Sequence, residues 1–534
     1  MRGSASTGAS GTEEYTQTYG RGPRAVDTDA SDVATAVRGS YCLSTVKNSL
    51  LETYLRATRT VEREHTDAAL EVVEGEVPRD LRGVLYRNGP GKMEVFGQPY
   101  GHPFDGDGMV TRFSFEEGAV RYTNRYVQTL ELRAEARARR MLYRSFGTNL
   151  PGGVRRNALR LNFKNAANTS VVLHAGRLLA LWEGGLPHAL DPVTLATHGR
   201  YDYAGRLQNP GSRLARAVAP ELPFSAHPKR DVDTGDLVNF GTLIGPQPRL
   251  ALYRVDPAGV MGAPRLVDLD ALSFVHDFVL TRRYAVFFLP SVAFDIPRTF
   301  LGLTTPVASL RSRPGGGSQV LLVPRDGGAP RRIAMDDGFV FHFANGFDDA
   351  DGRVIVDAMR LPDLPRADAT VRFLAGEDVA LPEARPTRFV IDPVRGTVVS
   401  HAPVGFSAEL PTVDPRTVGR AYRSFWAVAG DGHSPGPFMT RVARVEMATG
   451  AVQSIDFAPD LPGEPVFVPR PGSSADEGWV LVLVYRAATH RSDLVVLDAE
   501  GLAPVCRLAL PHHVPPGFHG TWAPAAGTPW LKRC

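Results

Sequence analysis

Residues 177–197, RLLALWEGGLPHALDPVTLAT, contain the pattern that decides the expected fold. An apolar run is followed by a Gly-Gly turn, and a second short run ends at an Asp-Pro pair. Short apolar runs bounded by Gly, Pro and Asp are typical of β-strands joined by tight turns. This stretch is therefore predicted to form neighbouring strands of one sheet.

Similar strand–turn units recur further along the chain. They are LALYRVDPAG (250–259), VLLVPRDGG (320–328), RFVIDPVRG (388–396), RVARVEMATG (441–450) and DLVVLDAEG (493–501). Their turns are separated by roughly 50 to 70 residues, so about seven units would fill residues 76–534. We therefore expect an all-β, seven-bladed β-propeller with long loops and short helices capping one face. A pair of β-sandwich domains is the alternative.

The N-terminal part has a different composition. Residues 1–40 are rich in Ser, Thr, Ala and Gly, and are predicted to be a disordered tail. A transit peptide is the alternative, although such peptides are poor in acidic residues and this segment contains five. Residues 41–75 are predicted to be a short helical lead-in, because Leu43, Val46, Leu50 and Tyr54 have helical spacing. Residues 76–534 are expected to form a single propeller domain.

Composition excludes several classes of function. Among 534 residues, 60 Lys and Arg nearly balance 57 Asp and Glu, and no dense basic run indicates a nucleic-acid partner. The three cysteines include no CxxC pair, which argues against a disulfide framework and suits a reducing compartment. No apolar stretch approaches the roughly 18 residues of a transmembrane helix. A cytoplasmic location is expected, with a plastid left open.

Five of the fourteen histidines lie within three residues of a phenylalanine: His102, His227, His276, His342 and His519. Each alone is explained more easily as a hydrogen-bonded core residue than as a ligand. Four of them, however, are separated by 49, 66 and 177 residues, which correspond to one, one and about three blades. Because equivalent positions in the blades of a propeller converge on its axis, these four imidazoles could form a transition-metal site.

Three glutamates stand in apolar or proline-flanked settings, where an unpaired charge would be costly. They are Glu183 in LALWEGG, Glu409 in FSAELP and Glu464 in PGEPVFVP. Metal-binding histidines commonly donate their second ring N–H to a carboxylate, which fixes the tautomer. The glutamates are therefore candidates for orienting the histidines, and turn residues at blade edges are the alternative.

Ten short motifs, in order between about residues 74 and 525, together resemble the carotenoid cleavage oxygenases. They are LYRNGPG, HPFDGDGMV, NRYVQT, NAANTSVV, LLALWEGG, SAHPKRD, FVHDF, FHFANGF, EPVFVPR and FHGTW. The stretches LYRSFGTNLPGG and LLALWEGGLPHALDP look most like the cyanobacterial apocarotenal 15,15′-oxygenase branch of that family.

The resemblance implies a seven-bladed propeller with one Fe(II) on its axis. The implied iron ligands are His227, His276, His342 and His519. Glu183, Glu409 and Glu464 would each bond one ligand histidine, which leaves His227 without a carboxylate partner. Thr169 would crowd an open iron position, and Trp182 would line the substrate tunnel. No side chain beyond the metal centre is expected to be catalytic.

The implied activity is that of a non-haem Fe(II) dioxygenase with O2 as co-substrate. It would cleave a conjugated C=C bond of a carotenoid or apocarotenoid to two aldehydes, at the 15,15′ position to give retinal. Three alternatives remain open. They are a stilbene-cleaving (lignostilbene-type) dioxygenase, a retinoid isomerase that consumes no O2, and a metal-free propeller that acts as an interaction scaffold.

An apolar segment suggests how a lipid-soluble substrate would be reached. Residues 299–310, TFLGLTTPVASL, are flanked by arginines on both sides. The resemblance favours a patch at the tunnel mouth, with Phe300, Leu301 and Leu303 in a membrane surface. Peripheral membrane association is therefore expected, and a loop packed on the propeller is the alternative.

Overall fold

A computed structural model describes most of the chain, and the predicted tail, residues 1–40, lies outside the described part. The described residues are 49–160, 162–213, 216, 219–245, 247–313, 316–402, 404–430 and 438–525. They belong to one compact unit, Lys47–Cys534.

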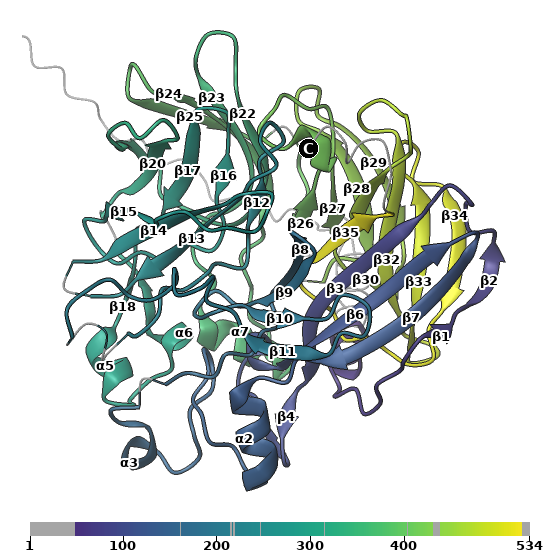
Figure 1. Cartoon of the computed structure of the whole chain (residues 1–534), viewed down its shortest axis with the longest axis horizontal. Helices are drawn as coiled ribbons and strands as arrows, with labels where there is room; N and C mark the ends of the chain where they lie inside the picture. The colour runs from purple at the N-terminus through teal and green to yellow at the C-terminus, as the bar shows by residue number, and fades with distance from the viewer. Residues whose placement is uncertain are drawn as a thin grey trace, which may run out of the picture. The chain divides into compact units, whose positions relative to one another are not determined.

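Seven antiparallel sheets in the described residues form the blades of a β-propeller (Figure 1), which confirms the predicted fold and excludes the β-sandwich alternative. Blade 1 contains β35 (Gly520–Pro524), β3 (Gly83–Lys92), β6 (Asp107–Glu116), β7 (Ala119–Tyr126) and β1 (Ala68–Ala69). Blade 2 contains β8 (Ser170–His174), β9 (Arg177–Leu181), β10 (His188–Leu190) and β11 (Thr197–Arg200). Blade 3 contains β12 (Lys229–Arg230), β13 (Leu237–Leu243), β14 (Arg249–Val255) and β15 (Arg265–Asp268). Blade 4 contains β16 (Val279–Leu280), β17 (Tyr284–Leu289), β20 (Ser318–Pro324) and β21 (Arg331–Met335).

The remaining three blades follow in chain order. Blade 5 contains β22 (Phe339–Asp348), β23 (Val354–Leu361), β24 (Arg385–Asp392) and β25 (Thr397–His401). Blade 6 contains β26 (Ala408–Thr412), β27 (Phe425–Ala429), β28 (Arg441–Glu446) and β29 (Ala451–Asp456). Blade 7 contains β30 (Leu461–Pro462), β31 (Val466–Pro469), β32 (Gly478–Arg486), β33 (Arg491–Asp498), β34 (Pro504–Ala509) and β2 (Glu71–Gly75). Two further pairs, β4 (Glu94–Val95) with β5 (Gln98–Pro99) and β18 (Val292–Phe294) with β19 (Leu310–Ser312), lie outside the blades.

The turns between strands explain the repeated Asp in the sequence pattern. Oδ1 of Asp256 accepts hydrogen bonds from the backbone N–H groups of Ala258 and Val260. Oδ1 of Asp392 accepts in the same way from Val394 and Arg395. An Asp that satisfies the backbone two to four residues ahead stabilises a tight turn, which ends one strand and starts the next.

The blades pack face to face through apolar side chains. Phe288 of blade 4 meets Phe343 and Phe389 of blade 5, with ring centroids 5.1 and 4.8 Å apart in edge-to-face geometry. Middle strands covered on both faces are apolar at nearly every position, as in GWVLVLVYR of β32, whose first five residues are all buried. This packing explains why the sequence shows continuous apolar runs rather than strict alternation.

Both ends of the described chain help to close the ring. β35, from the C-terminal part, pairs with β3 in blade 1. β2 pairs with β34 in blade 7, and β1 pairs with β7 in blade 1. Of the predicted helical lead-in, residues 41–75, residues 41–48 lie outside the described part and residues 49–57 are helical, but residues 68–75 mostly form these two strands. The strands of the propeller therefore begin before residue 76.

The helices are short, and those labelled in Figure 1 gather on one side of the described fold, in the lower part of the picture. Besides residues 49–57, the described helices include α2 (Leu130–Ala138), α3 (Val154–Asn157), α5 (Ile296–Phe300), α6 (Pro306–Ser309) and α7 (Ala367–Leu374), and single 3-10 turns occur at Pro103–Asp105 and Pro415–Thr417. α6 contacts both α5 and α7. Among the described residues, no helix is long and apolar enough to cross a membrane.

Candidate metal centre

The four predicted histidines stand at or near the starts of the innermost strands of four blades. His227 precedes β12, His276 precedes β16 and His519 directly precedes β35, while His342 lies within β22. A break in the β22–β23 register between Val340 and Phe343 surrounds His342, and such a bulge re-aims a side chain. The structure brings the four together: one ring nitrogen from each lies within 4.8 Å of the others.

The other three blades each contribute one more residue singled out from the sequence, at the equivalent position. Thr169 directly precedes β8 in blade 2, Glu409 lies in β26 of blade 6, and Glu464 precedes β31 in blade 7. The innermost strands contact one another around the axis, for example β8 with β35 and β22 with β26. Every blade therefore has one of these polar residues in or next to its innermost strand.

Three carboxylates orient three of the imidazoles. His276 Nδ1 lies 2.9 Å from Glu183 Oε1, His342 Nδ1 lies 2.5 Å from Glu409 Oε2, and His519 Nδ1 lies 2.7 Å from Glu464 Oε1. Because a carboxylate only accepts, each Nδ1 carries the proton and donates it. The lone pair of each of these rings is then on Nε2, the atom that faces the centre.

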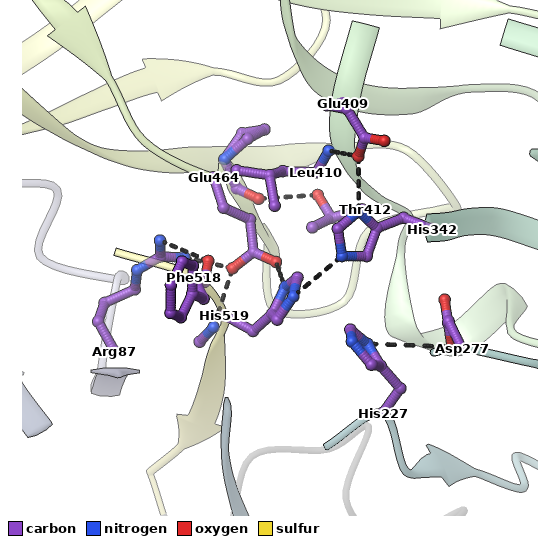
Figure 2. A network of polar contacts seen from close by, with 12 residues as sticks. Arg87, His227, Asp277, His342, Glu409, Leu410, Thr412, Glu464, Phe518 and His519 are labelled. Atoms are coloured by element: carbon purple, nitrogen blue, oxygen red, sulfur yellow. Dashed lines mark hydrogen bonds and ion pairs between the residues drawn. The ribbon is translucent and has the colours of Figure 1, made fainter. Parts of the chain in front are cut away.

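The Nε2 atoms are close enough to share one cation between them. His342 Nε2 and His519 Nε2 lie 3.2 Å apart (Figure 2), and His227 Nε2 and His276 Nε2 lie 2.9 Å apart. In the first pair both Nδ1 protons are engaged by carboxylates, so two neutral rings would present lone pairs to each other. Four imidazole nitrogens directed at one point suit a transition-metal ion, and the residues therefore fit such a group.

His227 differs from the other three histidines. Its Nδ1 lies 3.9 Å from Asp277 Oδ1, which is too long for a hydrogen bond. Asp277 instead accepts from Lys229 Nζ at 2.8 Å and from the Phe278 N–H at 2.7 Å. Among the described residues, His227 Nδ1 therefore has no carboxylate oxygen within hydrogen-bonding distance.

Burial keeps part of the cluster neutral. His227, His276 and His519 are all buried, and His342 is partly buried. Burial, reinforced by the neighbouring imidazoles, holds the pKa of His227 well below its usual range. Burial also lowers the pKa of His519, although Glu464 opposes it. For His276 burial acts in the same direction, but Glu183 outweighs it and the pKa is raised. Neutral imidazole is the form that binds a metal ion.

Aromatic side chains surround one side of the centre, and sequence reasoning did not single them out. The ring of Phe341 lies edge-on to His276, with centroids 5.5 Å apart, and Phe274 lies 6.4 Å from it. Phe274 also stacks on Phe146 and Phe339. Their only sequence signal was the density of Phe around His276 and His342. The predicted tunnel residue Trp182 is partly buried and packs over Gly184, where an added Cβ would lie 2.6 Å from the indole.

The predicted membrane residues lie on the surface, in and beside α5. Phe300, Leu301 and Leu303 are 38, 48 and 51% exposed. Ile296 of α5, together with Val154 and Leu159 in and after α3, is also exposed and apolar. The two segments adjoin each other, because the Leu159 N–H donates to the Phe300 carbonyl at 2.9 Å. We call these six residues the apolar patch.

The fold and the centre together define a class of protein: a β-propeller with an axial four-histidine group that can hold one metal ion. The profile of the family described as retinal pigment epithelial membrane protein matches residues 58–524. The chain belongs to this family, the carotenoid oxygenases that its motifs resemble.

Individual relatives agree with this assignment. The chain is 39% identical over 469 residues to apocarotenoid-15,15′-oxygenase of Synechocystis sp., a match that covers 86% of this chain and 93% of that protein. It is 30% identical over 484 residues to lignostilbene-alpha,beta-dioxygenase isozyme III of Sphingomonas paucimobilis, covering 86% and 94%. The crystal structure of cobalt-substituted Synechocystis ACO is similar with a TM-score of 0.83 at 37% identity, covering 89% of this chain and 99% of that one.

Proposed function

We propose that the chain is a non-haem Fe(II) dioxygenase that cleaves a conjugated C=C bond of an apocarotenoid, at the 15,15′ position, to give retinal and a second aldehyde. The observation that carries the proposal is the convergence of four Nε2 atoms, three of them on rings fixed by carboxylates. The 39% identity to an apocarotenoid-15,15′-oxygenase supports the substrate class.

In this proposal the protein's own groups bind and orient. His227, His276, His342 and His519 supply four neutral nitrogen ligands, so the site adds no negative charge of its own. Glu183, Glu409 and Glu464 hold the Nδ1 protons and keep each Nε2 directed inward. When bound, ferrous iron would supply the activation of O2, for which these side chains have no group.

The surroundings of the centre suit a long apolar polyene. Phe274 and Phe341 present apolar ring faces and edges beside His276 and leave little for water to bind. Thr169, whose backbone carbonyl accepts from the His519 N–H at 3.1 Å, would restrict one open position of the metal. Trp182, directly before Glu183, would line the route by which the substrate enters.

A labelled-oxygen experiment tests the reaction. Protein loaded anaerobically with Fe(II) is given 8′-apocarotenal and 18O2, and the aldehydes are reduced at once to alcohols to stop exchange with water. We expect loss of polyene absorbance and one labelled oxygen atom in each product, since O2 adds one atom to each carbon of the broken bond.

Controls separate the alternatives. His342→Ala should abolish turnover, whereas alanine at the exposed His198 should not change it. Full activity of His342→Ala would overturn the assignment of the centre. Turnover of stilbenes but not of apocarotenals would favour the lignostilbene-type reaction, for which a 30% identical relative exists. A protein that binds no iron and turns over none of these substrates would instead fit the metal-free interaction scaffold.

We also propose that the apolar patch rests in a membrane surface, which would bind the protein peripherally. The proposed location is the cytoplasm. Six exposed apolar side chains on two adjoining segments, with arginines at 155, 156 and 298, suit an interface with acyl chains and phosphates. Phe300→Ser with Leu303→Ser should reduce co-flotation with anionic liposomes severalfold. Val394→Ser, at an exposed turn of blade 5, is the control. Unchanged flotation of the double variant would contradict this role.

A further inference from the structure

A buried arginine contacts the metal centre from outside the histidine–carboxylate set. Arg87 lies in β3 of blade 1 and is 4% exposed. Its Nη1 donates to Glu464 Oε2 and its Nη2 donates to the Phe518 carbonyl at 3.3 Å (Figure 2). The guanidinium therefore links the carboxylate partner of His519 to the backbone that directly precedes His519.

The two carboxylate oxygens of Glu464 have different hydrogen-bond partners. Oε1 accepts from His519 Nδ1 at 2.7 Å, while Oε2 accepts from Arg87 and from the Gly520 N–H at 2.8 Å. Rotation of the carboxylate would break three hydrogen bonds at once. Arg87 thus fixes the oxygen that does not touch the histidine and, through it, the oxygen that does.

This arrangement distinguishes Glu464 from the other two carboxylates. The side chain of Glu464 is 6% exposed, whereas those of Glu409 and Glu183 are 19% and 29% exposed. Among the described residues, neither Glu183 nor Glu409 forms an ion pair with an arginine or lysine. A carboxylate as buried as Glu464 is stable in its charged form only with a partner cation, and Arg87 supplies it.

The backbone leaves space for the guanidinium. A Cβ at residue 520 would lie 2.5 Å from Arg87 Cδ, and one at residue 89 would lie 2.6 Å from the Gly517 Cα. Glycine at 89, 517 and 520 therefore allows β3 and the segment before β35 to approach closely with Arg87 between them. The contact is part of the closure of the ring, where β3 pairs with β35.

We propose that Arg87 is a positioning residue of the metal centre, which acts through Glu464 to hold His519 in its binding orientation. The inference rests on the proposed metal-binding function. According to this inference, the four imidazoles differ in how their orientation is fixed. His519 is held by a carboxylate that a guanidinium also binds. In the described part of the chain, the carboxylates that hold His276 and His342 have no such cation, and no carboxylate lies within hydrogen-bonding distance of His227.

The test uses Co(II) as a spectroscopic probe of the folded apoprotein. Arg87→Met should weaken Co(II) binding about 10- to 100-fold, the usual effect of losing a group that orients a ligand. It should also change the visible absorption of the bound Co(II), because the position of His519 changes. Arg87→Lys should restore part of the Co(II) affinity and part of the wild-type absorption spectrum. The matched control is Arg388→Met, which removes the guanidinium bonded to Asp357 in blade 5 at 2.7 and 2.8 Å. It should alter neither affinity nor spectrum.

A double variant keeps the proposal falsifiable if Arg87→Met alone does not fold, since Arg87→Met with Glu464→Gln leaves no unpaired buried charge. Its Co(II) affinity should equal that of Glu464→Gln alone, because Arg87 acts through Glu464. Additive losses, or an unchanged affinity and spectrum in Arg87→Met, would overturn the role of Arg87. Wild-type protein that binds no Co(II) would overturn the proposed metal function itself, and with it this inference.

Discussion

At the scale of single residues, the centre depends on which ring nitrogen carries the proton. Glu409 illustrates this: its Oε2 accepts from His342 Nδ1 at 2.5 Å and from the Leu410 N–H at 2.9 Å. Leu410 itself has a left-handed backbone, φ 53°, next to a break in the β26–β27 register. The local backbone is thus shaped to direct the carboxylate at the histidine.

Glu409→Ala should therefore weaken metal binding about 10- to 100-fold, because His342 loses the acceptor that fixes its tautomer. Metal titration of the apoprotein measures the change, and Glu117→Ala, at an exposed turn, is the control. Equal affinity in the Glu409 variant and the wild type would contradict the orienting role.

A second residue-scale prediction concerns stability and pH. His188 in β10 is buried, and neither ring nitrogen has a hydrogen-bond partner among the described residues. Burial, helped by Arg200 and Arg133, lowers its pKa from 6.5 to about 4. The unfolded chain then binds more protons between these values, so this contribution to stability is complete above pH 6.5 and is lost as the pH falls towards 4.

His188→Leu removes that dependence. Between about pH 7.5 and pH 5, the variant should lose about 2 kcal/mol less unfolding free energy than the wild type. Urea unfolding at both pH values measures the difference, with His198→Leu as the exposed control. If the unfolding free energies of the wild type and His188→Leu fell equally between the two pH values, the buried imidazole would not be the cause of the pH dependence.

At the scale of elements, the loops that carry the apolar patch are held by one buried arginine, Arg144, which is 0% exposed. Its guanidinium donates to the side chain of Asn149 and to the backbone carbonyls of Asn157, Arg160, Thr299 and Thr304, at 2.8 to 3.3 Å. It therefore joins the end of α3 to α5 and the segment after it.

Arg144→Met should destabilise the fold by about 3 kcal/mol or more, since several buried carbonyls lose a charged donor. Hydrogen exchange should increase at residues 154–160 and 296–304 before it increases in the blades. Arg155→Met, on the exposed face of α3, should change neither quantity. If hydrogen exchange in Arg144→Met increased equally in these segments and in all seven blades, Arg144 would not act locally on the two segments.

The elements also show what the sequence could predict. Blade strands and Asp-containing turns follow from local apolar runs and turn chemistry, so the propeller was predictable. β1 and β2 were missed because they are short, and because all five residues of β2 are exposed, EVVEG lacks the alternation of buried and exposed residues that marks a half-buried strand. Their pairing with β7 and β34 arises only from ring closure between distant parts of the chain.

At the scale of the whole molecule, the ring of blades brings residues that are far apart in the sequence close together at the axis. His342 and His519 are 177 residues apart, yet their Nε2 atoms are 3.2 Å apart because three blade steps return to the same axis. The spacing made the four histidines candidates and the apolar settings made the three glutamates candidates, whereas the resemblance of the motifs to a family assigned them as a set. Arg87 could not be found in this way, because nothing local in LYRNGPG distinguishes it from an exposed arginine.

A metal ion bound by four blades should also stabilise the fold. At a free metal concentration of about 100 times Kd, the gain should be about 2.7 kcal/mol, because the unfolded chain lacks the assembled site. Thermal unfolding with and without chelator measures it. His519→Ala should show little response to the chelator, and a full response in that variant would place the stabilising ion elsewhere.

The most direct measurement is anomalous diffraction at the iron edge from crystals of the Fe(II)-loaded protein. The account predicts one strong peak per chain, about 2.0–2.1 Å from the Nε2 atoms of His227, His276, His342 and His519, as for another imidazole-bound metal. A loaded crystal with no peak between these rings, or with iron only at another site, would contradict it.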